Sequence, residues 1–140
     1  MKLNTDCIRA VMLEIEKSLK ITVDAAGVIQ MDDLSICSLY VALPKYDKAD
    51  IFYALFNLEQ AGYLDLTTIW ADGGLALDCT INHMTFEGHE FLDRIRDPKH
   101  WSVIKSGLSA VRNYSLDAIN AIAGGVTSAA IAAYLEHNPL

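Results

Sequence analysis

Apolar side chains recur along the first half of the chain at the three- and four-residue spacing of helices that bury one face. The first stripe consists of Ile8, Val11, Met12, Ile15 and Leu19. It predicts a helix of about four turns that Asn4 or Thr5 caps. Residues 21–31 hold β-branched side chains and a glycine, so we expect a loop with a short strand there.

Two further helices are predicted by the same spacing. The second begins within residues 32–35 and is stopped by Pro44. The third spans residues 47–61, with Asp47 as its cap and Gly62 as the residue that ends it.

An alternating pattern replaces the helical one after Gly62. Residues 63–70 and 75–81 are rich in β-forming side chains, and Asp72-Gly73-Gly74 between them is a turn sequence. One face of the second strand would carry Leu75, Leu77, Cys79 and Ile81. The sequence therefore predicts a β-hairpin over residues 63–81.

Three more helices are predicted beyond the hairpin. Thr85, Asp97 and Ser115 can cap helices that extend to about residues 95, 111 and 135. The apolar stripes of the first two are Phe91, Leu92 and Ile95, and then Trp101, Ile104, Leu108 and Val111. Gly124 and Gly125 interrupt the last helix, where each glycine costs about 1 kcal/mol relative to alanine. Either that helix breaks there, or another element packs against the bare backbone.

This order of elements is that of a winged helix-turn-helix, in which the helix at 47–61 is the recognition helix and the hairpin at 63–81 is the wing. We therefore expect an α+β, mostly α fold: a winged helix-turn-helix of three helices plus a β-hairpin wing, with additional C-terminal helices. The expected division is a winged-helix domain at 1–96 and a C-terminal helical extension at 97–140. The extension would pack on that domain or form a dimer interface.

Four blocks of sequence are distinctive. They are M-K-L-N-x-D-C-I-R at the N-terminus, L-P-K-Y-D-K-A-D-I-F-Y-A-L at 43–55, L-E-Q-A-G-Y-L at 58–64 and T-F-E-G-H-E-F-L-D-R-I-R-D at 85–97. Over residues 1–115 the chain thereby resembles a bacterial, often prophage-borne, protein family of unknown function. Members of that family resemble winged-helix proteins, so the resemblance implies this fold and a phage or mobile-element setting. It implies no activity and carries over no catalytic residues.

The distribution of charge argues against duplex DNA binding, the most frequent role of a winged helix. Eleven Lys and Arg stand against eighteen Asp and Glu, which gives a net charge of −7. Residues 49–93, which include nearly all of the third helix and the whole wing, hold eight acids and no Lys or Arg. DNA binding draws much of its affinity from Lys and Arg on phosphates. The negative charge of Asp72, at the wing tip, would repel the phosphates of DNA.

A DNA-binding transcriptional regulator nevertheless remains the alternative hypothesis. Its candidate nucleic-acid contacts are Lys45, Lys48, Tyr53, Asn57 and Gln60. The two lysines could touch phosphate at the start of the helix, and Asn57 and Gln60 could read adenine edges. Five further basic residues lie within 94–112, where a solvated helix face is the simpler interpretation.

Small residues in the last predicted helix would allow a second helix to approach closely. The candidate oligomer interface is Ala121, Gly124, Gly125, Ser128, Ala129 and Ala132. We expect a homodimer, the commonest soluble oligomer, with the alternative that this helix folds back on its own domain. Residues 118–135 carry no charge, but their alanine-rich composition does not favour a membrane span.

Few side chains offer catalytic or metal-binding chemistry. Cys79, His83 and His89 form a C-x3-H-x5-H pattern, but zinc would need a fourth ligand. His89 is more simply a structural residue, with Gly88 beside it allowing close helix packing. The three cysteines are odd in number and far apart, so we expect reduced thiols in a cytoplasmic protein.

These observations predict a non-enzymatic protein with no catalytic residues, no metal and no cofactor. The primary hypothesis is an uncharacterised winged-helix regulatory or adaptor protein of phage or mobile-element type. It would act through contacts with an unknown protein partner.

Overall fold

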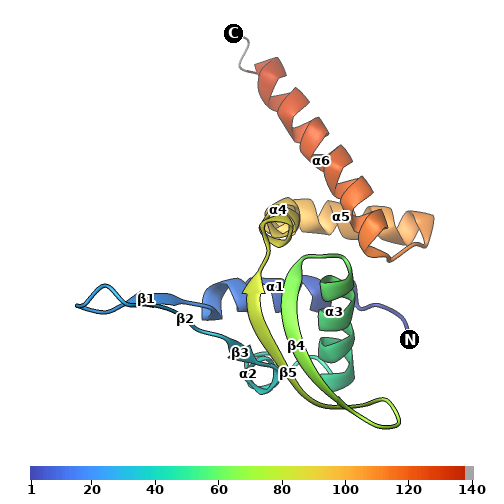
Figure 1. The fold of residues 1–140 in the computed structure, drawn as a ribbon. Coiled ribbons are helices and arrows are strands. Elements are labelled where there is room, and N and C mark those ends of the chain that lie inside the picture. Colours follow the sequence, from blue (N-terminus) through green and yellow to red (C-terminus); the bar gives the residue numbers. More distant parts are fainter. Residues whose placement is uncertain (138–140) are drawn as a thin grey trace. The chain divides into compact units, whose positions relative to one another are not determined.

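The computed structural model describes residues 1–137, without the side chains of 126–135 and 137. Over this part of the chain the fold is α+β and mostly helical, with six helices and two small antiparallel sheets (Figure 1). The chain forms two compact units, one from Met1 to His89 and one from Glu90 onward. Each unit is described by itself.

Two helices supply most of the core of the first unit. The first, α1 (Thr5–Ser18), begins where Asn4 Oδ1 accepts a hydrogen bond of 3.1 Å from the Cys7 N–H, so the predicted cap at Asn4 is confirmed. It packs against α3 (Lys48–Gln60). The fully buried side chains of these two helices are Cys7, Ile8, Val11, Met12 and Ile15 from α1 and Ile51, Leu55 and Leu58 from α3. The predicted stripe of the first helix is therefore a core stripe as far as Ile15, whereas Leu19, at the C-cap, is half-buried. Burial of each fully buried side chain contributes about 1.5–3 kcal/mol.

The predicted hairpin at 63–81 is confirmed as β4 (Leu64–Ala71) and β5 (Leu75–Met84). A short strand, β3 (Leu34–Ser35), pairs antiparallel with β5, so the sheet has the order β3-β5-β4. Helix α2 (Ile36–Ala42) follows β3 directly. Of the starts proposed for this helix, the structure selects Ser35, whose Oγ accepts a hydrogen bond from the Cys37 N–H.

The end of α3 sets the direction of the hairpin. Gly62 has φ +83°, in the left-handed region that favours glycine, which confirms its predicted role. The Gly62 N–H donates to the Glu59 carbonyl, and the Tyr63 N–H donates to the Leu58 carbonyl, each at 2.9 Å. These two bonds satisfy carbonyls that the end of a helix would otherwise leave unpaired.

The predicted face of β5 is only partly correct. Cys79 and Ile81 are buried, but Leu75 and Leu77 are 60% and 68% exposed. The register shifts between Ile69 and Trp70, which leaves Leu77 without a residue opposite it. A β-bulge of this kind interrupts the strict alternation on which the prediction rests.

Residues 21–31 form a hairpin of their own instead of the expected loop with one short strand. Strand β1 (Ile21–Val23) pairs antiparallel with β2 (Ile29–Met31), and we call this element the β1–β2 ribbon. Asp24 Oδ1 closes its turn by accepting hydrogen bonds from the N–H groups of Ala26 and Val28, at 2.8 and 2.9 Å. Each strand has three residues, too few for an alternating pattern to stand out in the sequence.

The second unit contains the end of α4 (Phe86–Ile95), and then α5 (Pro98–Val111) and α6 (Leu116–His137). The predicted caps of all three helices are confirmed, since Thr85, Asp97 and Ser115 each accept a hydrogen bond from a backbone N–H in the first turn. The buried side chains of α5 are Trp101, Ile104 and Leu108. Val111 was expected on the same stripe but is 62% exposed, because α5 ends there.

Helix α6 runs without a break through Gly124 and Gly125. It packs against α5, where Ile122 lies against Gly107, and its buried side chains include Ile119 and Ala123. A Cβ added at Gly124 or Gly125 would have no described atom within 4 Å. Neither predicted consequence of the two glycines, a break or a close contact, is therefore present in the part of the chain that the structure describes. No helix among these residues is long and apolar enough to cross a membrane.

Gly88 lies in close contact with the backbone of another element. A Cβ at this position would overlap the backbone carbonyl oxygen of Tyr63 and would lie 2.9 Å from Met84 Cγ. The expected close approach at Gly88 is thus confirmed.

We expect Gly88→Ala to destabilise the protein by about 1–3 kcal/mol, because the backbone of Tyr63 must move to admit a methyl group. Gly124→Ala is the matched control. Position 124 has open space for the methyl group, so this substitution should stabilise the helix by up to about 1 kcal/mol. Urea unfolding followed by circular dichroism measures both. Equal free energies of unfolding for the two variants would show that the close contact at Gly88 does not exclude a side chain at this position.

Candidate functional site

Two basic side chains lie at the start of α3, where the sequence places phosphate contacts. The Nζ atom of Lys48 is 5.4 Å from the centroid of the Tyr40 ring, and that of Lys45 is 5.6 Å from the centroid of the Tyr46 ring. A cation over an aromatic face gains about 0.5–1 kcal/mol at an exposed site. Both ammonium groups are exposed, and each has an aromatic partner within the protein.

The three other candidate DNA contacts on α3 are less available than the sequence suggests. Gln60 is exposed, but Tyr53 and Asn57 are half-buried. Asn57 Nδ2 donates a hydrogen bond of 2.8 Å to the Tyr53 carbonyl. This bond uses one of the two N–H donors of the amide and holds the Asn57 side chain against its own helix, whereas bidentate readout of adenine needs the amide to face outward.

An apolar surface, rather than a basic one, extends from α3 onto the hairpin. Phe52 of α3 contacts Trp70 of β4 edge-to-face, with ring centroids 6.1 Å apart, and stacks on Phe56 at 6.5 Å. The large apolar side chains exposed on the hairpin are Ile69, Trp70, Leu75 and Leu77, each between 52% and 68%. We call these four residues the hairpin tip. Exposed apolar clusters of this kind are typical of protein-binding surfaces.

Sequence reasoning missed the hairpin tip because it assigned one face of the strand to the core. The available signal was their position, since Ile69, Trp70, Leu75 and Leu77 lie within four residues of the Asp72-Gly73-Gly74 turn at the end of the hairpin.

A small pocket of about 160 Å³ lies between α2, α3 and β5. Its lining includes Cys37 and Tyr40 from α2, Phe52 from α3, and Leu77 and Asp78 from β5. The pocket is therefore part of the same apolar surface, with one carboxylate on its rim. Its size suits a single side chain of a partner better than a cofactor.

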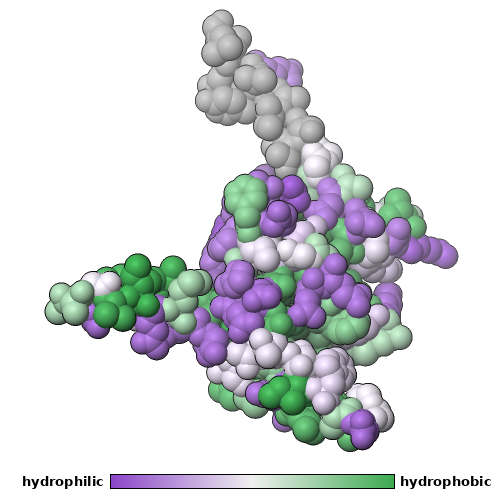
Figure 2. Space-filling model, viewed as in Figure 1, coloured by the Kyte–Doolittle hydropathy of each residue, from purple (hydrophilic) through white to green (hydrophobic). Residues whose placement is uncertain are grey.

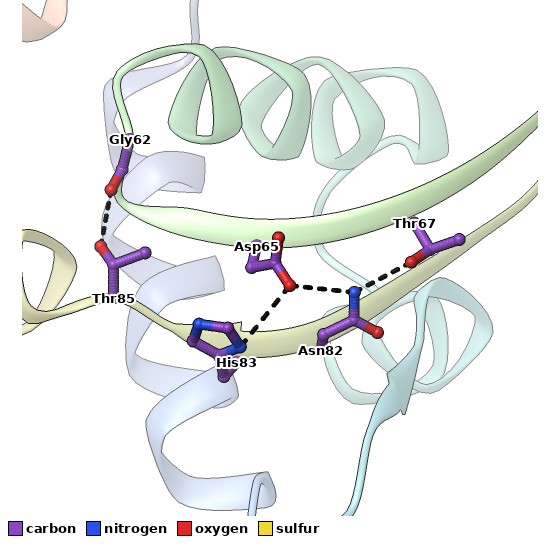
Figure 3. A network of polar contacts seen from close by, with 6 residues as sticks. All are labelled: Gly62, Asp65, Thr67, Asn82, His83 and Thr85. Atoms are coloured by element: carbon purple, nitrogen blue, oxygen red, sulfur yellow. Dashed lines mark hydrogen bonds and ion pairs between the residues drawn. The ribbon is translucent and has the colours of Figure 1, made fainter.

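A polar network lies on the other end of the hairpin, where β4 begins (Figure 3). Asn82 Nδ2 donates to Asp65 Oδ2 at 3.2 Å and to Thr67 Oγ1 at 2.9 Å, and His83 Nδ1 lies 3.6 Å from Asp65 Oδ2. Asn82 has no residue opposite it in the ladder. Its amide therefore fixes a second β-bulge, and a structural role accounts for the whole network. The His83–Asp65 pair is about half exposed, where such pairs contribute little.

The three members of the C-x3-H-x5-H pattern do not form a metal centre. Cys79 is buried and accepts a hydrogen bond of 3.7 Å from Thr68 Oγ1. His83 and His89 instead line a separate pocket of about 310 Å³ beside the β1–β2 ribbon. Within the described residues, no group of three or more His, Cys, Asp or Glu side chains could hold a metal ion.

Half of the predicted oligomer interface can be located in α6. Ala121, Gly124 and Gly125 are exposed. Ser128, Ala129 and Ala132 lie outside the described side chains. Their joint role in an interface remains a prediction.

The cysteine thiols differ sharply in their environment. Burial raises the pKa of the Cys7 thiol from 9.0 to about 12, and the nearby Asp50 carboxylate acts in the same direction. Burial also raises the pKa of Cys79. Cys37, in contrast, is exposed. Since the thiolate is the reactive form, Cys7 and Cys79 are protected both by burial and by protonation.

At about pH 8 we therefore expect an aromatic disulfide reagent to label Cys37 quickly in the native protein, and all three cysteines in urea. Cys37→Ser should remove the fast phase, whereas Cys79→Ser should leave it unchanged. Each labelled cysteine releases one aromatic thiol from the reagent, and the absorbance of that thiol measures the rate of labelling. Rapid native labelling that persists in Cys37→Ser would contradict the burial of the other two thiols.

Comparisons with known proteins support the resemblance to a family of unknown function. A family model described as "Hypothetical protein (DUF2513)" matches residues 2–112. A protein of Haemophilus influenzae described as "Uncharacterized protein" is 27% identical over 133 residues, which is 94% of this chain and 100% of that protein. No solved structure matches the chain.

Proposed function

Because the chain belongs to the family described as "Hypothetical protein (DUF2513)", whose description assigns no activity, we propose a function from its fold and surface. The protein is a non-enzymatic winged-helix regulatory or adaptor protein of phage or mobile-element type. It acts through protein contacts made by α3 and the hairpin tip.

The winged-helix assignment is supported by the order of elements in the first unit. Leaving aside the β1–β2 ribbon, α1 is followed by β3, α2, α3 and the β4–β5 hairpin, and the sheet order is β3-β5-β4. In this arrangement α3 occupies the position of a recognition helix and the hairpin occupies that of a wing. The ribbon is an insertion between α1 and β3.

The observation that carries the proposal is the apolar character of the face where such folds usually meet phosphate. The hairpin tip presents Trp70 and Leu77 to solvent, and Asp72 stands at its turn. Residues 49–93 supply no Lys or Arg to this face. A surface rich in aromatic and aliphatic side chains and poor in cations favours a protein partner over a nucleic acid.

The direct test is fluorescence anisotropy with labelled random duplex DNA, at low and then at physiological salt. Non-specific DNA binders reach about 1–100 µM at physiological salt and tighten steeply as salt falls. We expect no salt-dependent binding in this range. Lys48→Glu and the charge-matched control Lys17→Glu, on α1, should likewise show no salt-dependent DNA binding.

Salt-dependent binding that Lys48→Glu abolishes and Lys17→Glu preserves would overturn the proposal. It would establish the alternative, a DNA-binding regulator that docks through the start of α3.

Photo-crosslinking inside cells tests the protein contact itself. A benzophenone side chain placed at Leu77, in the hairpin tip, should give discrete protein adducts on irradiation. The same group at Ser102, an exposed polar position on α5, is the matched control and should give few. Nucleic-acid adducts at position 77, or identical protein adducts at both positions, would contradict a specific role for the hairpin tip.

A further inference from the structure

A pocket of about 310 Å³ lies where the end of α1, the base of the β1–β2 ribbon, the end of β5 and the first turn of α4 meet. All of the residues that line it belong to the first unit. Pockets for small molecules begin at about 300 Å³, and they combine an apolar wall with a few polar groups that fix the orientation of the ligand. The size of this pocket therefore suits one small molecule.

The pocket has an apolar wall that the core and the ribbon build together. Ile15 of α1 and Met84 of β5 are buried, so close packing holds them in place. Ile21 and Met31, which are paired across the ribbon, are 64% and 61% exposed. Figure 2 shows hydrophobic residues over the ribbon and hydrophilic residues beside its base. An apolar group that entered the pocket would remove part of this wall from water, which favours binding.

Side chains of both charges line the same pocket. Lys20 and Asp32 are opposite each other at the base of the ribbon, where the Asp32 N–H donates to the Lys20 carbonyl at 3.0 Å. Glu16, half-buried on α1, adds a second carboxylate, and His89 of α4 adds an imidazole. Among the described residues, the side chains of Lys20, Asp32 and His89 make no hydrogen bond or ion pair. Their polar groups are therefore available to a ligand.

The other polar side chains of the lining already have partners. Asn82 Nδ2 donates to Asp65 and Thr67, and His83 Nδ1 lies 3.6 Å from Asp65 Oδ2 (Figure 3). This network holds the β5 side of the pocket in one shape before a ligand arrives. Such preorganisation reduces the cost of ordering the site on binding.

The charges of the lining distinguish the ligands that the pocket could receive. A polyanion such as a nucleotide would meet two carboxylates and one ammonium group, which disfavours it. An uncharged apolar molecule would take water from Lys20 and Asp32 and give them no partner in return. A small zwitterion offers a carboxylate to one and an ammonium group to the other, in charge-assisted hydrogen bonds.

The spacing of the two charged residues also suits one kind of zwitterion. Residues opposite each other in an antiparallel pair have Cβ atoms about 4.5–5.5 Å apart, so Lys20 and Asp32 start from neighbouring positions. An α-amino acid carries its ammonium and carboxylate groups on one carbon atom, and its side chain leaves from the same atom. It can therefore meet both charges while its side chain lies on the apolar wall.

We propose that this pocket binds a free α-amino acid with an apolar side chain. Asp32 and Glu16 hold its ammonium group, Lys20 and His89 hold its carboxylate, and the apolar wall receives its side chain. The pocket shares no lining residue with the hairpin tip. The inference therefore does not depend on the role proposed for that surface.

Methionine methyl groups report binding directly, because Met31 and Met84 line the pocket whereas Met1 and Met12 do not. The full chain is isotope-labelled at its methionine methyl groups, and L-leucine or, separately, L-phenylalanine is added. Titration to about 10 mM suits the affinity of about 0.1–1 mM expected of so small a ligand. We expect saturable shifts of the Met31 and Met84 signals in the nuclear magnetic resonance spectrum. The signal of Met12, in the core, should not move.

Two analogues of leucine each remove one charge from the ligand. L-leucinamide lacks the carboxylate, and N-acetyl-L-leucine lacks the ammonium group. We expect each analogue to bind about three- to tenfold more weakly than L-leucine, because each loses the hydrogen bonds of one charged group.

Variants of the protein assign each charge of the ligand to its partner. Asp32→Asn should weaken L-leucine binding about three- to tenfold and leave N-acetyl-L-leucine binding unchanged, since that analogue has no ammonium group to hold. Lys20→Gln should weaken L-leucine binding to a similar extent and leave L-leucinamide binding unchanged. Asp33→Asn and Lys17→Gln are the matched controls: both residues are exposed and outside the pocket, so both variants should bind L-leucine like the parent protein. An unchanged Met12 signal checks that each variant keeps its core.

The absence of a saturable shift at Met31 and Met84 with both amino acids would overturn the proposal. Equal affinity for L-leucine and its two analogues would also overturn it, because the pocket would then recognise only an apolar group. Equal weakening by Asp32→Asn and Asp33→Asn, or by Lys20→Gln and Lys17→Gln, would show that the net charge of the protein acts on the ligand and that the two pocket residues do not hold it.

Discussion

The first unit depends on a crowded junction around the backbone of Tyr63. Its N–H donates to the Leu58 carbonyl at the end of α3, and its own carbonyl accepts from the Thr85 N–H at 3.1 Å. Thr85 Oγ1 donates to the Gly62 carbonyl at 2.6 Å and accepts from the Gly88 N–H at 3.0 Å. One set of four bonds therefore joins the end of α3, both ends of the β4–β5 hairpin and the first turn of α4. These bonds fix the direction in which the hairpin leaves α3, and Gly88 lets the first turn of α4 pack directly against the Tyr63 backbone.

That direction exposes apolar side chains where a nucleic-acid-binding wing would expose cations. Three polar side chains on α3 and the loop before it already have partners: Asn57 bonds to its own helix, and Lys45 and Lys48 lie over tyrosine rings. The groups on this surface that have no partner in the described residues are the exposed apolar side chains of the hairpin tip. The hairpin tip and the β1–β2 ribbon share this property, although they lie on different elements.

Helix positions, caps and the main hairpin could be predicted from the sequence because each depends on residues close together in the chain. The apolar stripe of α1, the glycine at 62 and the cap at Asp97 are examples. The failures have a common cause, which is that burial depends on partners distant in sequence. Leu77 fits the alternating pattern and is exposed, because a bulge removes its opposite residue. The sequence predicts one short strand within residues 21–31, but it does not reveal the second strand of the ribbon or β3. Strands of two or three residues carry too little pattern, and only their pairing reveals them.

The junction at Tyr63 also has a consequence for the order in which the chain folds. All of its bonds, and the whole β4–β5 ladder, lie within the continuous segment 58–88. Contacts close in sequence need little loop closure, whereas the pairing of Leu34 with Ile81 and the packing of α1 on α3 join distant parts of the chain. We therefore expect this segment to form early and to serve as the surface on which α1 and β3 later assemble. The ribbon, which no described element covers, would take no part in that nucleus.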